Sequence, residues 1–145
     1  MYGYDTLNET YQKDNIKQKN MDYAAGTILI CRETGRFLLA LRGDGGNFPF
    51  TWATIGGGID HLEKPLDAAK RELYEETHIP SEGIEFVFYE IQHLKGTDYY
   101  LFLGYCDEEY ECQLNGENED WGWFDMETLP EPLIPTLYAS LIDIF

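Results

Sequence analysis

Three carboxylates in one short segment are the residues of this sequence best suited to chemistry. Glu72, Glu75 and Glu76 are spaced i, i+3 and i+4, and in an α-helix that spacing projects all three side chains from nearly the same face. Like charges so close repel one another, and a hard divalent cation with oxygen ligands relieves that repulsion. A solvated acidic helix face is the more common explanation of such a trio, so its surroundings must decide.

The residues around the trio favour the metal-binding interpretation. Arg71 directly precedes Glu72 and is able to hold one carboxylate in place. Three consecutive glycines, Gly56, Gly57 and Gly58, lie upstream, and a backbone without Cβ atoms lets carbonyl groups approach a bound ion closely. The segment therefore combines acidic ligands, a cation to orient them and an open backbone.

The segment Gly57–Ile79 resembles the Nudix box. The pattern of that box is Gly, five residues, Glu, seven residues, and then Arg-Glu-apolar-x-Glu-Glu-x-Gly-apolar. The positions in register here are Gly57, Glu63, Arg71, Glu72, Leu73, Glu75, Glu76 and Ile79. The sequence departs from the pattern at His78, which replaces the second Gly, and at Leu62, where a Gly usually precedes the first Glu. A Gly permits a left-handed helix end that His adopts only at a cost, so the resemblance does not predict the geometry of that end.

The resemblance implies a set of metal ligands and a set of residues that orient them. The implied ligands are the side chains of Glu72, Glu75 and Glu76 and the backbone carbonyl of Gly56 or Gly57. Arg71 and Glu63 would hold the carboxylates in orientation, as metal ligands generally require. The implied cofactor is Mg²⁺, with Mn²⁺ as a substitute.

A further acidic residue is implied near the end of the chain. Many members of the family bring one more Glu from a loop just ahead of the last strand's Trp, and Glu117 stands six residues before Trp123. Glu119 lies in the same acidic stretch. Because loops are often acidic for reasons of solubility, a catalytic or metal-binding role for Glu117 competes with that simpler interpretation.

The implied activity is hydrolysis of a pyrophosphate linkage in a nucleoside diphosphate derivative. Two Mg²⁺ ions on the diphosphate would neutralise its charge and lower the pKa of the attacking water. One carboxylate, in the trio or Glu117, must accept the proton of that water, and the sequence leaves open which. The substrates considered are ADP-ribose, NADH, a dinucleoside polyphosphate and a (d)NTP, with capped RNA disfavoured by the short chain and the lack of basic surface.

Aromatic residues and one arginine are the candidates for holding the nucleotide. Aromatic rings stack on any base through its flat face, although most aromatic side chains belong to the core. The candidates for stacking are Phe48, Phe50, Tyr99, Tyr100 and Trp121. Arg42 is the candidate for a phosphate contact, and the loop Gly43–Phe50 is a candidate lid.

The pattern along the chain predicts two hairpins, a central helix and a C-terminal helix. The expected elements are strands Asp22–Cys31 and Arg36–Arg42, a brief strand Thr51–Ile55 leading to the glycines, a helix from Pro65 to Pro80, strands Ile84–His93 and Asp98–Cys106, a strand Trp121–Phe124 and a helix Thr136–Phe145. This order resembles the α/β/α sandwich of the family, with a mixed β-sheet. Residues 1–20 are expected to form a flexible arm and residues 21–145 a single domain.

Charge and cysteine content restrict the partners and the compartment. The net charge is -17, from 27 acidic and 10 basic residues. Such a charge repels phosphate backbones and anionic lipid, so it argues against nucleic acid and membranes and for a small nucleotide as the partner. The three cysteines form no CxxC pair, and no signal peptide or membrane span is evident, so we expect a cytoplasmic protein. Exchange of the N-terminal arm is one route to a homodimer.

Two other functions remain open at this point. A nucleotide-binding or sensing module of the same fold would bind without turnover, although such a module does not need every metal carboxylate. An acidic protein-interaction domain with a coincidental motif would bind no specific Mg²⁺. Following thermal stability during a Mg²⁺ titration separates the second from the others.

Overall fold

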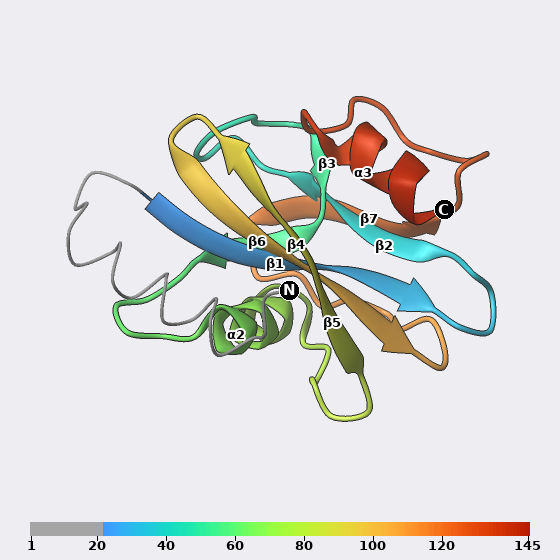
Figure 1. The fold of residues 1–145 in the computed structure, drawn as a ribbon. Helices are drawn as coiled ribbons and strands as arrows, with labels where there is room; N and C mark the ends of the chain where they lie inside the picture. Colours follow the sequence, from blue (N-terminus) through green and yellow to red (C-terminus); the bar gives the residue numbers. More distant parts are fainter. Residues whose placement is uncertain (1–21) are drawn as a thin grey trace.

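The computed structural model describes residues 22–145, which form a mixed β-sheet between two helices (Figure 1). The strands are β1 (Asp22–Cys31), β2 (Phe37–Arg42), β3 (Trp52–Ala53), β4 (Ile55–Gly58), β5 (Glu85–Leu94), β6 (Thr97–Cys106) and β7 (Asn118–Phe124). The helices are α2 (Pro65–Thr77) and α3 (Leu137–Ile144). The expectation of a flexible arm over residues 1–20 lies outside the described residues.

Strand β1 is the centre of the sheet. It pairs in parallel with β6 along its whole length, from Asp22 opposite Thr97 to Cys31 opposite Cys106. Its other edge is shared: residues Ala24–Thr27 pair with β4, and Ile30 pairs with Phe37 of β2, both antiparallel. Strands β3 and β7 extend the sheet from β2, and β5 extends it from β6. The mixed sheet predicted from the sequence is confirmed.

Alternation along the strands divides the core between the two helices. Successive side chains of a strand point to opposite faces of the sheet, so Leu29 and Cys31 of β1 pack with Leu73 of α2, whereas Ile28 and Ile30 pack with Leu137 and Leu141 of α3. The helices lie on opposite faces of the sheet (Figure 1). This arrangement is the predicted α/β/α sandwich.

The glycine segment differs from the expected brief strand Thr51–Ile55. The strand is interrupted at Thr54, and the glycines themselves form β4 with Gly26 opposite Gly56. Close approach explains the residue type, because a Cβ on Gly26 or Gly56 would collide with the hydroxyl of Tyr99. The glycines therefore belong to the sheet, which fixes their backbone beside α2.

Two other elements differ from the prediction by more than one residue at an end. Helix α2 ends at Thr77, before Pro80, because His78 adopts a left-handed conformation with φ 63° and ψ 16°. Strand β7 begins at Asn118, earlier than the predicted Trp121, because Asn118 pairs with Arg42 of β2. Neither helix of the described residues is long and apolar enough to cross a membrane.

Two buried threonines make a matched test of this core. Thr27 and Thr77 are both fully buried. The Thr27 hydroxyl has no hydrogen-bond partner among the described residues, whereas the Thr77 hydroxyl donates to the Leu73 carbonyl at 2.6 Å and accepts from the Ile79 amide at 3.1 Å.

We expect Thr27→Val to raise the free energy of unfolding by about 1 kcal/mol, because it removes an unsatisfied polar group from a strand at nearly constant volume. Thr77→Val should lower it by about 1 to 3 kcal/mol, because it breaks two hydrogen bonds at the end of α2. Urea denaturation of both variants measures the difference. A loss of stability in Thr27→Val equal to that in Thr77→Val would contradict the prediction.

Candidate active site

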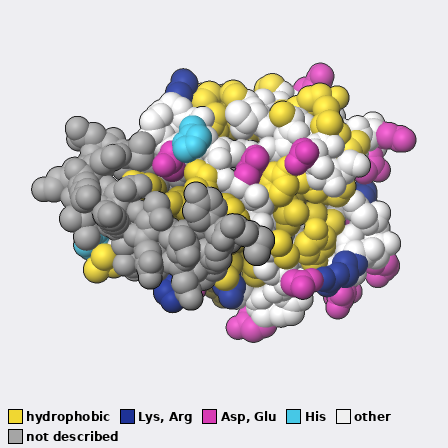
Figure 2. Space-filling model, in the orientation of Figure 1, with side chains coloured by type: hydrophobic (Ala, Val, Ile, Leu, Met, Phe, Trp, Pro, Cys, Tyr) yellow, Lys and Arg dark blue, Asp and Glu magenta, His cyan; other side chains and the backbone are white. Residues whose placement is uncertain are grey.

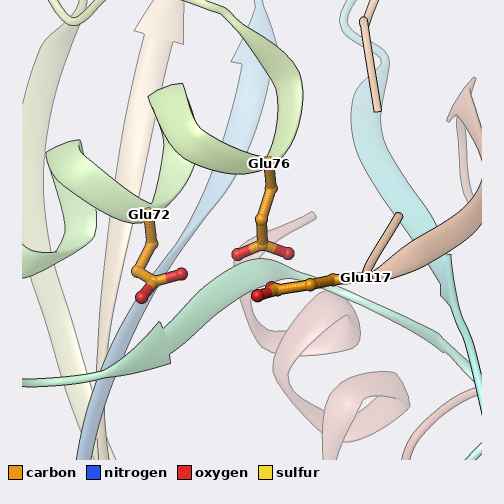
Figure 3. Close-up of side chains that lie close together, drawn as sticks. All are labelled: Glu72, Glu76 and Glu117. Carbon is orange, nitrogen blue, oxygen red and sulfur yellow. The ribbon is translucent and has the colours of Figure 1, made fainter. Parts of the chain in front are cut away.

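Three glutamates converge between α2 and the start of β7. Glu72 and Glu76 lie on α2, and Glu117 directly precedes β7. One carboxylate oxygen from each lies within 4.8 Å of the other two. Figure 3 shows Glu72 and Glu76 reaching down from the helix and Glu117 entering from the right of the view, below Glu76. This acidic cluster joins two segments that are far apart in the sequence.

Arg71 holds the carboxylates around the cluster. Its guanidinium donates two hydrogen bonds of 2.9 Å to the two oxygens of Glu63. It also donates to Glu72 at 2.9 Å and to Glu75 at 3.0 Å. A further hydrogen bond of 2.9 Å goes to the carbonyl of Gly58. These contacts lower the pKa of Glu63 and raise that of Arg71, so this guanidinium stays charged and ties the helix to the loop before it.

Gly57 makes room for the Glu72 carboxylate. A Cβ at this position would lie 2.6 Å from the carboxylate carbon of Glu72, which is closer than any real contact permits. Any side chain there would displace Glu72 from the cluster. The glycine of β4 is thus needed for the position of a carboxylate on α2.

Glu76 is the most deeply buried acid of the cluster, with 4% of its surface exposed. Its Oε1 accepts a hydrogen bond of 2.7 Å from Nδ2 of Asn118, while its buried Oε2 has no hydrogen-bond partner among the described residues. Its pKa is raised to about 9, mainly by burial and also by the neighbouring Glu72 and Glu117, while the hydrogen bond from Asn118 lowers it. Burial also raises the pKa of Glu72, against the opposing effect of Arg71.

The donor set fits a divalent cation. Hard cations prefer carboxylate oxygens. Oε2 of Glu76 is buried without a hydrogen-bond partner among the described residues, so the charge of an ion would replace the missing donor. A bound cation would lower the raised pKa values of Glu72 and Glu76, since an adjacent positive charge favours the ionised form. Residues Gly56, Gly57 and Gly58 line the same cavity, with their backbone beside the carboxylates.

Glu75 lies outside the acidic cluster. Half of its side chain is exposed, and its carboxylate is bound to Arg71. The structure therefore brings together Glu72, Glu76 and Glu117 of the predicted ligands and places Glu75 beside them. Metal ligation by any of these four glutamates, or by the glycine carbonyls, stays a prediction.

The acidic cluster forms one end of a cleft, and the other end is largely apolar. The acidic end is lined by Glu72, Glu76, Glu117, Asn118 and Asp44, among others. The apolar end is lined by Phe48, Leu94, Tyr99, Leu101, Ile134, Pro135 and Leu137, with Thr54, Gln92, Thr97 and Thr136 between them. Arg42 and the glycines of β4 line both ends. A molecule with an anionic part and a flat apolar part matches this division.

The structure brings three of the six candidate nucleotide-binding residues to the cleft. Arg42, Phe48 and Tyr99 line it, and the Tyr99 hydroxyl is hydrogen-bonded to the Thr54 hydroxyl at 2.9 Å. Tyr100 points to the opposite face of the sheet, where it is buried against α2.

The remaining two aromatic candidates lie elsewhere. Phe50 is 49% exposed and is not part of the cleft lining, and Trp121 packs against the core on the α2 side of the sheet. Neither position brings an aromatic ring to the face of a bound nucleotide in this conformation. Their proposed roles stay predictions.

Several lining residues were not found from the sequence. Asn118 donates a hydrogen bond to Glu76. It directly follows the candidate ligand Glu117, and an amide side chain at that position was the signal that could have indicated its role. The segment 134–137 reaches the cleft through a backbone bridge, in which Trp52 accepts from Ile134 at 2.9 Å. No local pattern indicates that contact, because it depends on how the segment after the last strand crosses the sheet.

The two residues that replace glycines of the Nudix box, Leu62 and His78, both have the left-handed backbone conformation that glycine adopts easily. Leu62 has φ 62° and His78 has φ 63°. The backbone of His78 caps α2, since its N–H donates to the Tyr74 carbonyl at 2.8 Å. The helix end therefore has the left-handed geometry of a glycine cap without the glycine.

The buried Glu76 carboxyl predicts how the stability of the metal-free protein changes with pH. Its pKa is about 9 in the folded protein and has the ordinary value of 4.5 when unfolded. Between these values the folded state binds more protons, so the free energy of unfolding falls as the pH rises. The glutamine of Glu76→Gln cannot ionise and keeps an oxygen that accepts from Asn118. We therefore expect this variant to lose less free energy of unfolding than the parent between about pH 5 and about pH 9. Thermal melts with a chelator measure this, and equal pH profiles would refute it.

The comparisons with known proteins agree with the fold and identify the family of this chain. The family model described as NUDIX domain matches residues 21–143. A curated relative, the RNA pyrophosphohydrolase of Bartonella quintana, is 31% identical over 83% of this chain and 86% of its own length. The protein of the same description from Bartonella henselae is 34% identical over 57% of this chain, and the match spans 61% of that relative's length.

The solved structures extend the agreement to three dimensions. The crystal structure of a Nudix hydrolase from M. smegmatis superposes with a TM-score of 0.68 and 24% identity, covering 83% of this chain and 81% of that one. This likeness concerns the fold, whereas the family model and the curated relatives concern the sequence. Together with the box on α2, they show that this chain belongs to the Nudix family of pyrophosphohydrolases.

Proposed function

We propose that this enzyme hydrolyses the pyrophosphate linkage of a small nucleoside diphosphate derivative, with Mg²⁺ held by Glu72, Glu76 and Glu117. The observation that carries the proposal is the convergence of these three carboxylates at one end of a cleft whose other end is apolar. ADP-ribose, NADH, a dinucleoside polyphosphate and a (d)NTP all combine a diphosphate with a base, as this cleft requires. Mn²⁺ would substitute for Mg²⁺, because it accepts the same oxygen ligands.

Residues of the chain would orient the metal ligands and accept the proton of the attacking water. When bound, the divalent ion supplies positive charge that neutralises the diphosphate and acidifies the attacking water. Arg71 and Asn118 fix Glu72 and Glu76 in place by direct hydrogen bonds. A carboxylate accepts the proton of the water, and Glu117 suits this role because it is exposed at the cleft and Arg71 does not hold it.

The apolar end of the cleft would hold the base. Phe48 and Tyr99 offer rings to a flat ligand, and Leu94 and Leu101 add aliphatic surface. Arg42 lines both ends of the cleft, which supports a contact between its guanidinium and a phosphate that extends between base and metal. Glu75 and Glu63 would act through Arg71, which both of them bind.

A second candidate substrate is the 5′ end of an RNA. It is favoured by the curated relatives, which are described as RNA pyrophosphohydrolases. The net charge of -17 opposes an extended phosphate backbone. On the part of the surface that Figure 2 shows uncovered, Lys and Arg side chains stand at separate places among acidic ones and form no continuous basic patch. We therefore place a small nucleotide first.

A cytoplasmic location also stays a proposal, which cell fractionation would test.

A substrate panel tests the proposed activity. The panel contains ADP-ribose, NADH, a dinucleoside tetraphosphate, dGTP and a 5′-triphosphorylated RNA oligomer, each with Mg²⁺ and with a chelator. We expect Mg²⁺-dependent turnover of at least one small nucleotide, faster than turnover of the RNA. Glu76→Gln should lower kcat by about 10²- to 10³-fold, because a buried charge that binds the ion is lost.

Each other result of the panel points to a different function. Mg²⁺-dependent nucleotide binding without turnover would favour a sensing module of the same fold. Faster turnover of RNA would make the second candidate the substrate. If Mg²⁺ raises the melting temperature of Glu76→Gln as much as that of the parent, the cluster is not the metal site.

Arg42 provides a test of the position of the phosphates. Arg42→Ala should raise KM by about 10-fold or more, because a charge-assisted hydrogen bond to a phosphate is lost. Arg32→Ala is the matched control, since Arg32 forms a surface ion pair with Glu85 and is not among the residues lining the cleft. Steady-state kinetics of both variants measure the difference. An unchanged KM in Arg42→Ala would remove this residue from the proposed site.

A further inference from the structure

The C-terminal end of α2 is attached to the segment that carries Glu117. The Thr77 carbonyl accepts a hydrogen bond of 2.9 Å from the Gln113 amide. The next residue, His78, returns a contact from its side chain: Nδ1 lies 3.2 Å from the Gln113 carbonyl oxygen. Because a carbonyl oxygen only accepts, the imidazole must donate here through Nδ1–H. The backbone amide and carbonyl of Gln113 are therefore held by Thr77, the last residue of α2, and by His78, which caps it.

The orientation of the imidazole is set by the helix itself. The left-handed backbone of His78 turns the chain out of the helix, and the ring packs edge-on against Tyr74 with 5.4 Å between the ring centroids. A glycine at this position, as in the Nudix box, would adopt the same backbone conformation without strain. It would have no ring to donate to Gln113.

The segment from Gln113 to Asn118 is anchored at both of its ends. Gln113 is attached to Thr77 and His78, and Asn118 is attached to Glu76 by the 2.7 Å hydrogen bond in the acidic cluster. Glu117 lies between these anchors, and its backbone carbonyl accepts from Gly43 at 3.1 Å. A shift of Gln113 away from α2 would therefore be transmitted to the Glu117 carboxylate within four residues.

We propose that His78 is a positioning residue that holds the segment 113–118 against α2, so that Glu117 completes the metal site. The proposal rests on the proposed metal role of Glu117. It gives a physical reason for the departure from the Nudix box: the strain of a left-handed histidine is offset by a fixed position for a carboxylate that comes from outside the helix.

The test compares metal affinity in a double-mutant cycle. Mn²⁺ and Mg²⁺ affinities of the full chain are measured by isothermal titration calorimetry for the parent, His78→Gly, Glu117→Gln and the double variant. His78→Gly should weaken binding by about 3- to 10-fold, which corresponds to one hydrogen bond. In the Glu117→Gln background the same change should have no further effect, because the carboxylate that His78 positions is gone.

A second measurement reports the attachment without the metal. Hydrogen exchange of peptides covering residues 110–118 should become faster in metal-free His78→Gly, while α2 keeps its protection. Leu62→Gly is the matched control, because it also replaces a left-handed residue by glycine but lies ahead of α2. Leu62→Gly should leave metal affinity and the exchange of residues 110–118 unchanged. If both variants lose metal affinity to the same extent, the cause is the greater backbone flexibility of glycine, and the proposal is overturned.

The outcomes separate this proposal from the function on which it rests. If Glu117→Gln binds metal as tightly as the parent, Glu117 is not a ligand, and both proposals about that residue fail. If Glu117→Gln weakens binding and His78→Gly does not, only the positioning role of His78 fails. An equal effect of His78→Gly in both backgrounds would show that it acts through the helix and not through Glu117.

Discussion

Repulsion among carboxylates that are partly removed from water is the physical problem on which this structure depends. Glu72 and Glu76 are buried on one face of α2, and Glu117 is brought against them. Arg71 forms an ion pair with Glu72 of this group, and the same guanidinium also binds Glu63 and Glu75. One guanidinium shared among several acids cannot neutralise them all. The remaining charge is balanced by protonation in the metal-free chain or by a divalent cation.

The elements next to the acidic cluster hold its carboxylates in place despite their repulsion. The glycines of β4 keep the space beside Glu72 free of side chains, and the pairing of β4 with β1 makes their backbone rigid. Asn118 supplies a neutral donor to Glu76, which satisfies one oxygen and leaves the other for an ion. Strand β4 thus supports the acidic cluster beside Glu72, and the start of β7 supports it beside Glu76.

The residues of the acidic cluster were easier to predict from the sequence than the lining of the cleft, because the cluster depends on local spacing and the cleft on long-range contacts. Helical spacing is a local property, so the positions of Glu72, Glu76 and Arg71 followed from the sequence around them. Tyr99 and Tyr100 show the opposite case: strand alternation sends them to opposite faces, but only the pairing of β6 with β1 decides which face holds the cleft. The contribution of residues 134–137 and the hydrogen bond of Asn118 to Glu76 depend on tertiary contacts, which no local pattern encodes.

The parallel pairing of β1 with β6 has a consequence for the order in which the protein is made. Strand β1 is synthesised early, but its parallel neighbour begins only at Thr97, and Glu117 follows later still. A ribosome-bound chain that has emerged only as far as α2 therefore lacks both β6, the parallel partner of the central strand, and one wall of the ion site. Contacts of such long sequence separation form slowly, so capture of the ion belongs to the last stage of folding, after nearly the whole chain has left the ribosome.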